Sequence, residues 1–538
     1  MPLTQSVIHN LTTSLRSRRI NDGIAVLQQI DNDLLEVGPE VPRAGRFLLL
    51  IAQWVDVGFR DAQFLSSLLT RFKTDTRKEQ SLQDYHYLRM AEGFCALATG
   101  NSDEAIRTLD LVLGSLEDID DRDQLALAHF WKGRAHRKKG EYELSLPHII
   151  RARELALASD DKVFAAIAGI QESWLLFQKG MTKEALRGLD RAEAALKTTD
   201  HFIALGNIES ARGRIVRRSG DYASALKYFA SASRLYEKRD ARHQNLARSL
   251  VNAAYVRRIL ALQIRKRIDQ AQRSGRQRTL DRSRVGHGTA ESLRSRYQQL
   301  CHEAKQDLNR AREIYAFHAN EDGIGKVTLN LGYLHLDRGE IDRASEEADA
   351  AYQMGLGRKD HILMARARIL GAACENAHVD EQTGEHDDAA IHANRAREWS
   401  DEALALARGT QNRRLLAGAS IISGMTAANE FYQDWEKARQ CASEATAMMV
   451  PGESDQLVEG LSDLKTRIVQ ASGINDTLRA WSEGMVGNKT FRQVTEEFAE
   501  IVIPKVWLRN DKKISRVAEQ LSISPKKVRR VLRNVGWS

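Results

Sequence analysis

The chain ends in a group of cations whose chemistry would be contact with the phosphates and base edges of a nucleic acid. In the stretch PKKVRRVLRN (525–534), three apolar residues, Val528, Val531 and Leu532, recur at helical spacing. They would face a core, so the basic side chains between them would face outward. These are Lys526, Lys527, Arg529, Arg530 and Arg533. An outward cationic face of this kind is typical of a helix that enters a DNA groove.

The residues just before this helix predict how it is positioned. Ser524 followed by Pro525 is a helix start signal, with serine as the N-cap and proline at the first helical position. A short apolar pattern that includes Ala518 predicts a preceding helix that ends near Leu521. Ala518 lies ten residues before Val528, and a small residue there lets two helices cross closely. This spacing resembles a helix-turn-helix motif.

The motif implies two sets of DNA contacts. The N-terminal half of the second helix usually reads base edges, which assigns that role to Lys526, Lys527 and Arg530. The cations expected to hold phosphates are Arg529, Arg533, Lys512, Lys513 and Arg516. Ser524 is grouped with these DNA-binding residues. A bidentate arginine–guanine contact would contribute about 1–3 kcal/mol of discrimination. The alternative is that these cations form only the solvated face of a helix.

Residues 487–538 as a whole resemble a Fis-type DNA-binding domain, which many bacterial enhancer-binding activators carry at the C-terminus. The shared features are an acidic and apolar helix (VTEEFAEIVIPKVWLRN), a polar turn, the helix-turn-helix and a terminal NVGW. The resemblance implies that the early helices pair two subunits. Pro504 within the first helix departs from the family pattern, as does Ser522 at a turn position where glycine is common.

The net charge of +8 is unevenly distributed. Residues 504–538 hold ten Lys/Arg against two acidic residues, and residues 265–296 hold ten against three. The rest of the chain is therefore mildly acidic, an asymmetry that favours a nucleic-acid partner. The second basic region contains an arginine-rich loop near 272–290, with Arg276, Arg278, Arg282 and Arg284. This loop is either a solvated insertion or a secondary contact for nucleic-acid phosphates.

A repeat of 40 residues precedes both basic regions and continues between them. The strings GNSDEA, GEYELS, GMTKEA and GDYASA begin at Gly100, Gly140, Gly180 and Gly220. Small or apolar residues follow each glycine at offsets of five, nine and twelve, which lie on one helical stripe. We interpret each unit as a helical hairpin whose first helix ends at the glycine in a left-handed C-cap. One hairpin cannot bury its stripe alone, so the hairpins must stack.

The pattern returns as GEIDRA (339–344), GEHDDA (384–389) and, without glycine, QDWEKA (433–438). These units resemble tetratricopeptide repeats (TPR), although 40 residues exceeds that family's usual 34. We therefore expect an all-α protein, with a TPR-like right-handed α-solenoid over residues 1–450, a connector over 451–486 and a helix-turn-helix domain over 487–538. Pro147 lies inside a predicted second helix, so we expect a late start or a kink there.

Two segments of the sequence match known catalytic or cofactor-binding motifs only weakly. GIGKVT (323–328) has valine where a phosphate loop needs Ser or Thr after lysine, and it falls in a predicted repeat helix. His386 and His392 are six apart with Asp387 and Asp388 between them, a spacing that does not align the two histidines. We expect no enzyme activity, no cofactor and no metal. The ATPase of the Fis-type activators has no counterpart here, so their mechanism of activation is not expected.

These patterns together favour a cytoplasmic, bacterial-type transcriptional regulator. It would bind a specific site on double-stranded DNA as a homodimer, while the superhelix senses a protein or peptide in its groove. Four scattered cysteines, the lack of an 18-residue apolar run and the lack of a signal-like N-terminus favour the cytoplasm over a membrane or secreted setting. The alternatives are a non-catalytic TPR adaptor, or an RNA-binding or phage-defence accessory protein that uses the arginine-rich loop.

Overall fold

The structure is a computed structural model of the 538-residue chain. It describes residues 5–72 except 36, 40 and 42, and then residues 81–116, 121–277, 287–381, 386–471, 481 and 487–537. Every regular element in these ranges is a helix, as predicted. The chain divides into two compact units, residues 1–461 and residues 462–538.

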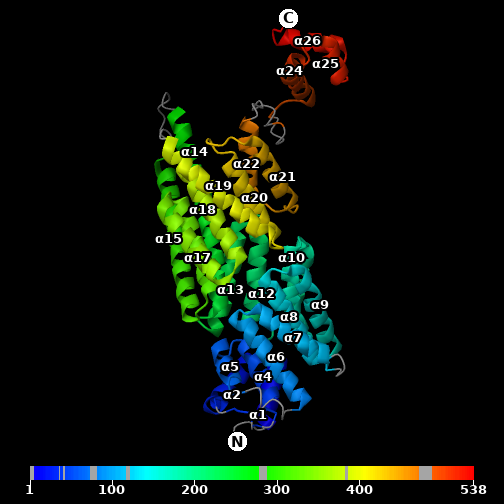
Figure 1. The fold of residues 1–538 in the computed structure, drawn as a ribbon, viewed down its shortest axis with the longest axis vertical. Coiled ribbons are helices and arrows are strands. Elements are labelled where there is room, and N and C mark those ends of the chain that lie inside the picture. The colour runs from blue at the N-terminus through cyan, green and yellow to red at the C-terminus, as the bar shows by residue number, and fades with distance from the viewer. Residues whose placement is uncertain are drawn as a thin grey trace. The chain divides into compact units, whose positions relative to one another are not determined.

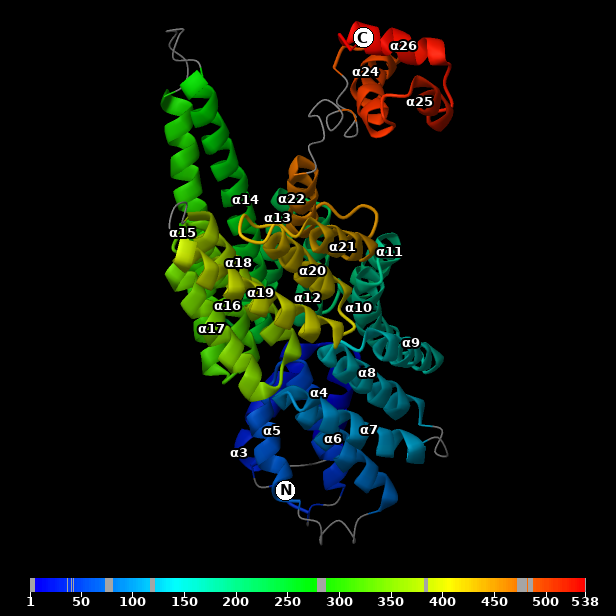
Figure 2. The same ribbon diagram turned by 45° about the horizontal axis from the view of Figure 1, so that its top comes forward.

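The first unit is a stack of antiparallel helices (Figures 1 and 2). It opens with α1 (Gln5–Arg16), α2 (Ile20–Gln29), α3 (Asp31–Leu34), α4 (Ala44–Asp56) and α5 (Ala62–Leu69). Successive hairpins follow: α6 (Leu82–Thr99) with α7 (Ser102–Leu116), α8 (Arg122–Lys139) with α9 (Tyr142–Ala158), α10 (Lys162–Gln178) with α11 (Thr182–Leu196), and α12 (Phe202–Arg218) with α13 (Tyr222–Arg239). The series continues with α14 (Gln244–Gln277) and α15 (His287–Phe317), α16 (Glu321–Asp337) and α17 (Ile341–Arg358), α18 (His361–Glu381) and α19 (His386–Arg408), and α20 (Arg413–Ala427) and α21 (Trp435–Ala447).

The repeat glycines end the first helices of their hairpins in the left-handed conformation, as predicted. Their φ angles are 96° at Gly100, 82° at Gly140, 86° at Gly180 and 81° at Gly220. A side chain is strained in this region, which explains why glycine recurs there. At the same position of the repeat that lacks glycine, Gln433 adopts a φ of 49°. The backbone geometry is therefore conserved between repeats even where the residue is not.

The predicted small-residue stripe is buried in every repeat that prompted it. The residues five and nine after each glycine are 0% exposed: Ala105, Ser145, Ala185, Ala225, Leu109, Ile149, Leu189 and Phe229. Gly213 on α12 lies so close to Phe229 on α13 that an added Cβ would approach the ring to 2.7 Å. The stack of stripes forms the solenoid core, and the two helices of a hairpin approach closely because the residues at the crossing are small.

Two local expectations have different outcomes. Of the late start or kink expected at Pro147, the late start is wrong, because α9 begins at Tyr142 and runs through the proline. Proline lacks the N–H that would bond the carbonyl of Glu143, so the helix loses one hydrogen bond near its start. GIGKVT lies within α16 as predicted, and Gly323 packs against the ring of Tyr315 rather than opening a phosphate loop.

The long helices α14 and α15 lie side by side and extend past their neighbours (Figure 2). They contain 34 and 31 residues and flank the arginine-rich segment. The loop predicted near 272–290 is wrong at both ends, where residues 272–277 belong to α14 and residues 287–290 to α15; residues 278–286 lie outside the described part of the chain. Arg278, Arg282 and Arg284 lie outside the described residues, and the side chain of Arg276 lies outside them too.

The end of the solenoid folds back onto its middle. The N–H of Ser454 donates to the carbonyl of Arg218 at 2.8 Å, and its hydroxyl donates to the carbonyl of Ser219 at 2.7 Å. Nε of Arg413, at the start of α20, donates to the carbonyl of Gln178 at 3.3 Å. Segments more than 230 residues apart in sequence thus meet at the C-terminal ends of α10 and α12.

Helix α22 (Gln456–Ala471) occupies much of the segment expected as a connector. Further along, the described residues of the second unit form α24 (Phe491–Arg509), α25 (Ile514–Gln520) and α26 (Pro525–Asn534). Within the described ranges, no helix is both long and apolar enough to span a membrane. The four cysteines are buried and free, as small core residues would be.

Candidate nucleic-acid interface

The three C-terminal helices share one apolar core. Its buried members are Ala499, Ile503, Val517, Ala518, Val528, Val531 and Leu532. Leu521 and Ile523 pack against this cluster from the turn between α25 and α26. Every apolar residue predicted from the pattern therefore faces the core. Ala518 is 6% exposed, in keeping with its predicted place at a close helix crossing.

The turn between α25 and α26 is tight. Ser522 adopts a φ of 53°, so serine occupies the left-handed position that was predicted to favour glycine. The N–H of Ile523 donates to the carbonyl of Ala518 at 3.0 Å, and the N–H of Ser522 donates to that of Glu519 at 3.1 Å. These bonds close the end of α25 and fix the angle at which α26 leaves.

Helix α26 starts where the sequence predicts. The backbone N–H of Lys527 donates to the hydroxyl of Ser524 at 3.2 Å, and Pro525 occupies the first turn. Ser524 is thus an N-cap that sets the start of the helix.

The cations of α26 face away from the core. Lys526, Arg529, Arg530 and Arg533 are exposed, while Lys527 is half-buried beside α24. Val528, Val531 and Leu532 on the opposite side are at most 3% exposed. The helix therefore has a cationic side that faces solvent and an apolar side that packs on the core of the unit. This is the arrangement expected of a helix that contacts a nucleic-acid groove.

The other predicted cations lie at the start of α25. Lys512 has a φ of 61°, and its ammonium group lies 5.9 Å from the centre of the Trp507 ring. Lys513 is the exposed N-cap residue of α25, and Arg516 lies 3.3 Å from Asp511. Lys512 and Lys513 thus lie just before the short helix that precedes α26 and Arg516 lies in its first turn, a region where phosphate contacts are expected for the motif.

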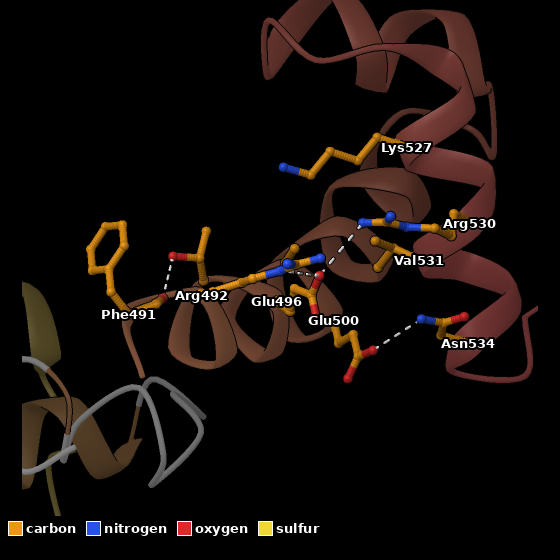
Figure 3. A pocket seen from close by; sticks show the side chains of 10 residues that line it. Phe491, Arg492, Glu496, Glu500, Lys527, Arg530, Val531 and Asn534 are labelled. Carbon is orange, nitrogen blue, oxygen red and sulfur yellow. Dashed lines mark hydrogen bonds and ion pairs between the residues drawn. The ribbon is translucent and has the colours of Figure 1, made fainter. Parts of the chain in front are cut away.

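Acidic residues of α24 face α26, a feature that the sequence patterns did not predict. Arg530 points toward Glu496, with N and O atoms 4.0 Å apart, and Nδ2 of Asn534 donates to Glu500 at 3.3 Å (Figure 3). The two helices line a pocket of about 460 Å³ that also includes Phe491. The charge of Arg530 is therefore shared between solvent and an exposed carboxylate. Glu496 and Glu500 lie one turn apart on the predicted first helix, and this acidic pair was the pattern in the sequence that could have indicated a contact with a basic helix.

A second face of α24 is apolar and exposed. Phe491, Phe498 and Leu508 are 87%, 50% and 47% exposed. Val494 and Ile501 lie between them at half-buried positions. The first four of these residues are three, four and three positions apart, and Leu508 follows two helical turns after Ile501, so the five lie on one stripe along the helix. Ala499 and Ile503, which enter the core of the unit, lie on the opposite side.

Comparisons with known proteins assign neither a family nor a function to the chain. No protein-family model matches the chain, and a search of curated proteins finds no match. Among solved structures, the chain is similar to a Rap protein complexed with competence and sporulation factor, at 15% identity and a TM-score of 0.47 over 75% of this chain and 99% of that one. It is also similar to the apo quorum sensor NprR from B. thuringiensis, at 12% identity and a TM-score of 0.48 over 73% of this chain and 98% of that one. A third similar structure is yeast Tom70, at 13% identity and a TM-score of 0.40 over 89% of this chain and 98% of that one. Such low identities assign no ligand or activity to this chain.

Proposed function

We propose that the chain is a sequence-specific DNA-binding transcriptional regulator, with the C-terminal unit as a helix-turn-helix domain. The observation that carries the proposal is the outward cationic stripe of α26, held on an apolar core at the spacing of that motif. The charge of the segment adds support, because phosphate contacts supply much of the affinity for DNA.

In the proposed complex α26 lies in the major groove. Lys526 and Arg530, on the side opposite the core, reach base edges, and Lys527 reaches the groove from its flank. Arg529 and Arg533 contact phosphates of one strand, and the cations at the start of α25 contact the other. In free protein Glu496 holds Arg530 only through a long contact between exposed groups, which costs little to release.

The regulator acts as a homodimer in this proposal. The apolar stripe of α24 supports it, since an exposed row of phenylalanine and leucine on a helix is stabilised by a second copy of the same row. Phe498→Glu would place a charge in this row without touching the core of the unit. Sedimentation should then show a monomer where the native chain sediments as a dimer.

The solenoid senses a protein or peptide partner in this proposal. Its ligand would change DNA binding only through unequal affinity for two states of the protein. The segment around Ser454, which joins the end of the solenoid to its middle, is an element whose contacts could differ between such states.

Selection of bound fragments from a genomic DNA pool by the full-length protein tests the proposed function. The selected site should bind about 10³-fold or more tightly than random sequence in a mobility-shift titration at fixed salt. Equal affinity for selected and random duplexes would leave a non-specific adaptor. No affinity for duplexes at modest ionic strength would refute DNA binding altogether.

A further inference from the structure

Several arginines in the interior of the solenoid have no carboxylate partner. Arg137 on α8 and Arg214 on α12 are both half-buried, and their Nε atoms are shielded from solvent without a hydrogen-bond partner. Neither side chain forms an ion pair or hydrogen bond with any described residue. Most arginines nearby are paired, such as Arg134 with Asp56 at 2.6 Å. Buried cations are normally paired, so these two indicate a site for an anion.

The two arginines belong to a larger cluster around one aromatic pair. The Tyr142 ring lies edge-on to the Trp174 ring at 5.3 Å, and the guanidinium of Arg137 lies 5.2 Å from the centre of the Trp174 ring. Four arginines from three helices lie close enough to influence the Tyr142 hydroxyl: Arg366, Arg137, Arg218 and Arg214. Arg366, on α18, is exposed and has no ion pair among the described residues.

The arginines repel one another. Burial, together with the nearby Arg248 and Arg134, lowers the pKa of Arg137 to about 9. Burial, with Arg248 and Arg217, lowers the pKa of Arg214 to about 9. Both groups still carry their charge at neutral pH. A ligand anion would relieve this repulsion, so the cluster is preorganised for one.

The next part of the same surface shows what kind of anion it holds. Glu453 is 8% exposed and lies 2.8 Å from Arg413, 2.9 Å from Arg414 and 3.7 Å from Arg218. Asp455, 5% exposed, pairs with Arg414. An acidic peptide segment of the chain itself, GESD (452–455), is thus held by arginines of α12 and α20. Arg218 belongs both to this contact and to the cluster around Tyr142.

We propose that Arg137, Arg214 and Arg366 form a binding site for the side-chain carboxylates of an acidic peptide, which would extend the surface that already holds Glu453. The proposal names the ligand chemistry of the partner-sensing solenoid, and in that respect rests on the proposed function. Its physical basis is separate, because none of its residues belongs to the DNA-binding unit. Planar guanidinium groups bind carboxylates through paired hydrogen bonds, which favours arginine over lysine in such a site.

Fluorescence anisotropy with the full-length protein tests the site. The probe is a labelled peptide of five Glu-Ala repeats, and the reference is the same peptide with Gln in place of Glu. The native protein should bind the Glu peptide at least about tenfold more tightly at low salt. The double variant Arg137→Gln/Arg214→Gln should lose at least about tenfold in affinity for it.

A matched control separates the site from overall charge. Arg187→Gln/Arg191→Gln removes two exposed cations from α11, on the second helix of a neighbouring hairpin, and should leave peptide affinity unchanged. The single variant Arg366→Gln changes an exposed side chain and cannot fail by unfolding the core, so its loss of affinity is a second readout. Equal losses in the control and the double variant would overturn the proposal.

The test also distinguishes this site from the basic tail. Lys526→Gln/Arg530→Gln should keep peptide affinity while losing affinity for the selected DNA site. If instead only this tail variant loses the peptide, the acidic-peptide site is refuted while DNA binding stands. A third arm adds inorganic phosphate as competitor: displacement at millimolar phosphate with no preference for Glu over Gln would refute peptide recognition in favour of a simple anion site.

Discussion

The solenoid and the C-terminal unit both collect arginine, but they hold it in opposite ways. On α26 most of the cations are exposed to solvent, while Val528 and Val531 on the opposite side of the helix are buried. The spacing of residues in the sequence predicts this arrangement. In the solenoid, Arg137 and Arg214 are half-buried near other arginines, and Arg137 lies 5.2 Å from the centre of the Trp174 ring. An exposed cationic helix suits a long polyanion such as DNA, whereas a half-buried cluster suits a few carboxylates.

The two regions also pack differently. Hairpins of the solenoid cross at glycine and alanine, so backbones approach closely and large side chains from the partner helix fill the space, as Phe229 does at Gly213. The C-terminal unit fills its core mainly with branched residues, with Ala499 and Ala518 as the small members. The solenoid should therefore be sensitive to added volume, and the C-terminal unit to changes of charge and turn geometry.

The largest effect is expected from Gly213→Val. The new side chain would overlap the ring of Phe229, whose atoms lie 2.7 Å from an added Cβ. We expect the solenoid to lose about 3 kcal/mol of unfolding free energy, measured by urea denaturation. As a control, Gly169→Ala on α10 meets nothing within 4 Å and should gain about 0.5–1 kcal/mol because alanine favours a helix. Equal effects from both would contradict close packing at the crossing.

In the C-terminal unit, Arg530→Ala should change specificity and Lys513→Ala should not. Loss of a base contact should reduce discrimination between the selected site and single-base variants by about 1–3 kcal/mol. Loss of a phosphate contact should weaken all sequences alike and lower the slope of log affinity against log salt by about one. Mobility-shift titrations at several salt concentrations measure both. Indistinguishable behaviour of the two variants would refute the assigned roles.

Acid should destabilise the solenoid more than the C-terminal unit. Nδ1 of His129 lies 2.8 Å from Nδ1 of His148, and burial, with Lys132 nearby, lowers the pKa of each to about 4. The unfolded chain takes up these protons near pH 6.5 and the folded chain only near pH 4. The stability that depends on keeping these two histidines neutral is thus complete above pH 6.5 and is lost as the pH falls toward 4. Residues 487–538 contain no histidine.

The thermal midpoint of the solenoid, followed by circular dichroism from pH 7.5 to 4.5, measures this dependence. His148→Gln should flatten the curve, because one of the two groups that must be kept neutral is gone. A curve as steep as that of the native protein would show that other groups cause the acid sensitivity.

The smallest effects concern the left-handed turn positions. Ser522→Gly should stabilise the C-terminal unit by about 0.5–1 kcal/mol, since glycine adopts a φ of 53° without strain. Lys359→Gly, at a φ of 54° after α17, should do the same for the solenoid. Thermal unfolding of each variant gives the shift. Destabilisation by Ser522→Gly would mean that the serine side chain contributes more than its backbone costs.

Local patterns predicted much of this molecule. The 40-residue spacing predicted the hairpins, their glycine caps and the buried stripe, since each depends on one helix and its immediate neighbour. The same holds for the cap at Ser524 and for the outward side of α26. The predicted late start at Pro147 is wrong, because α9 continues through the proline and buries Ser145 before it and Ile149 after it. Glu496 was overlooked because its partner, Arg530, lies 34 residues away.

The sequence by itself determined the helices, their caps and which side of each is apolar, because these follow from residues three or four apart. Only the tertiary structure decided which charges meet. Arg137, Arg214 and Arg366 belong to helices up to 229 residues apart and converge on Tyr142 because the solenoid curls back on itself. Electrostatic interaction depends on distance through space and on burial, and neither quantity is a property of spacing along the chain.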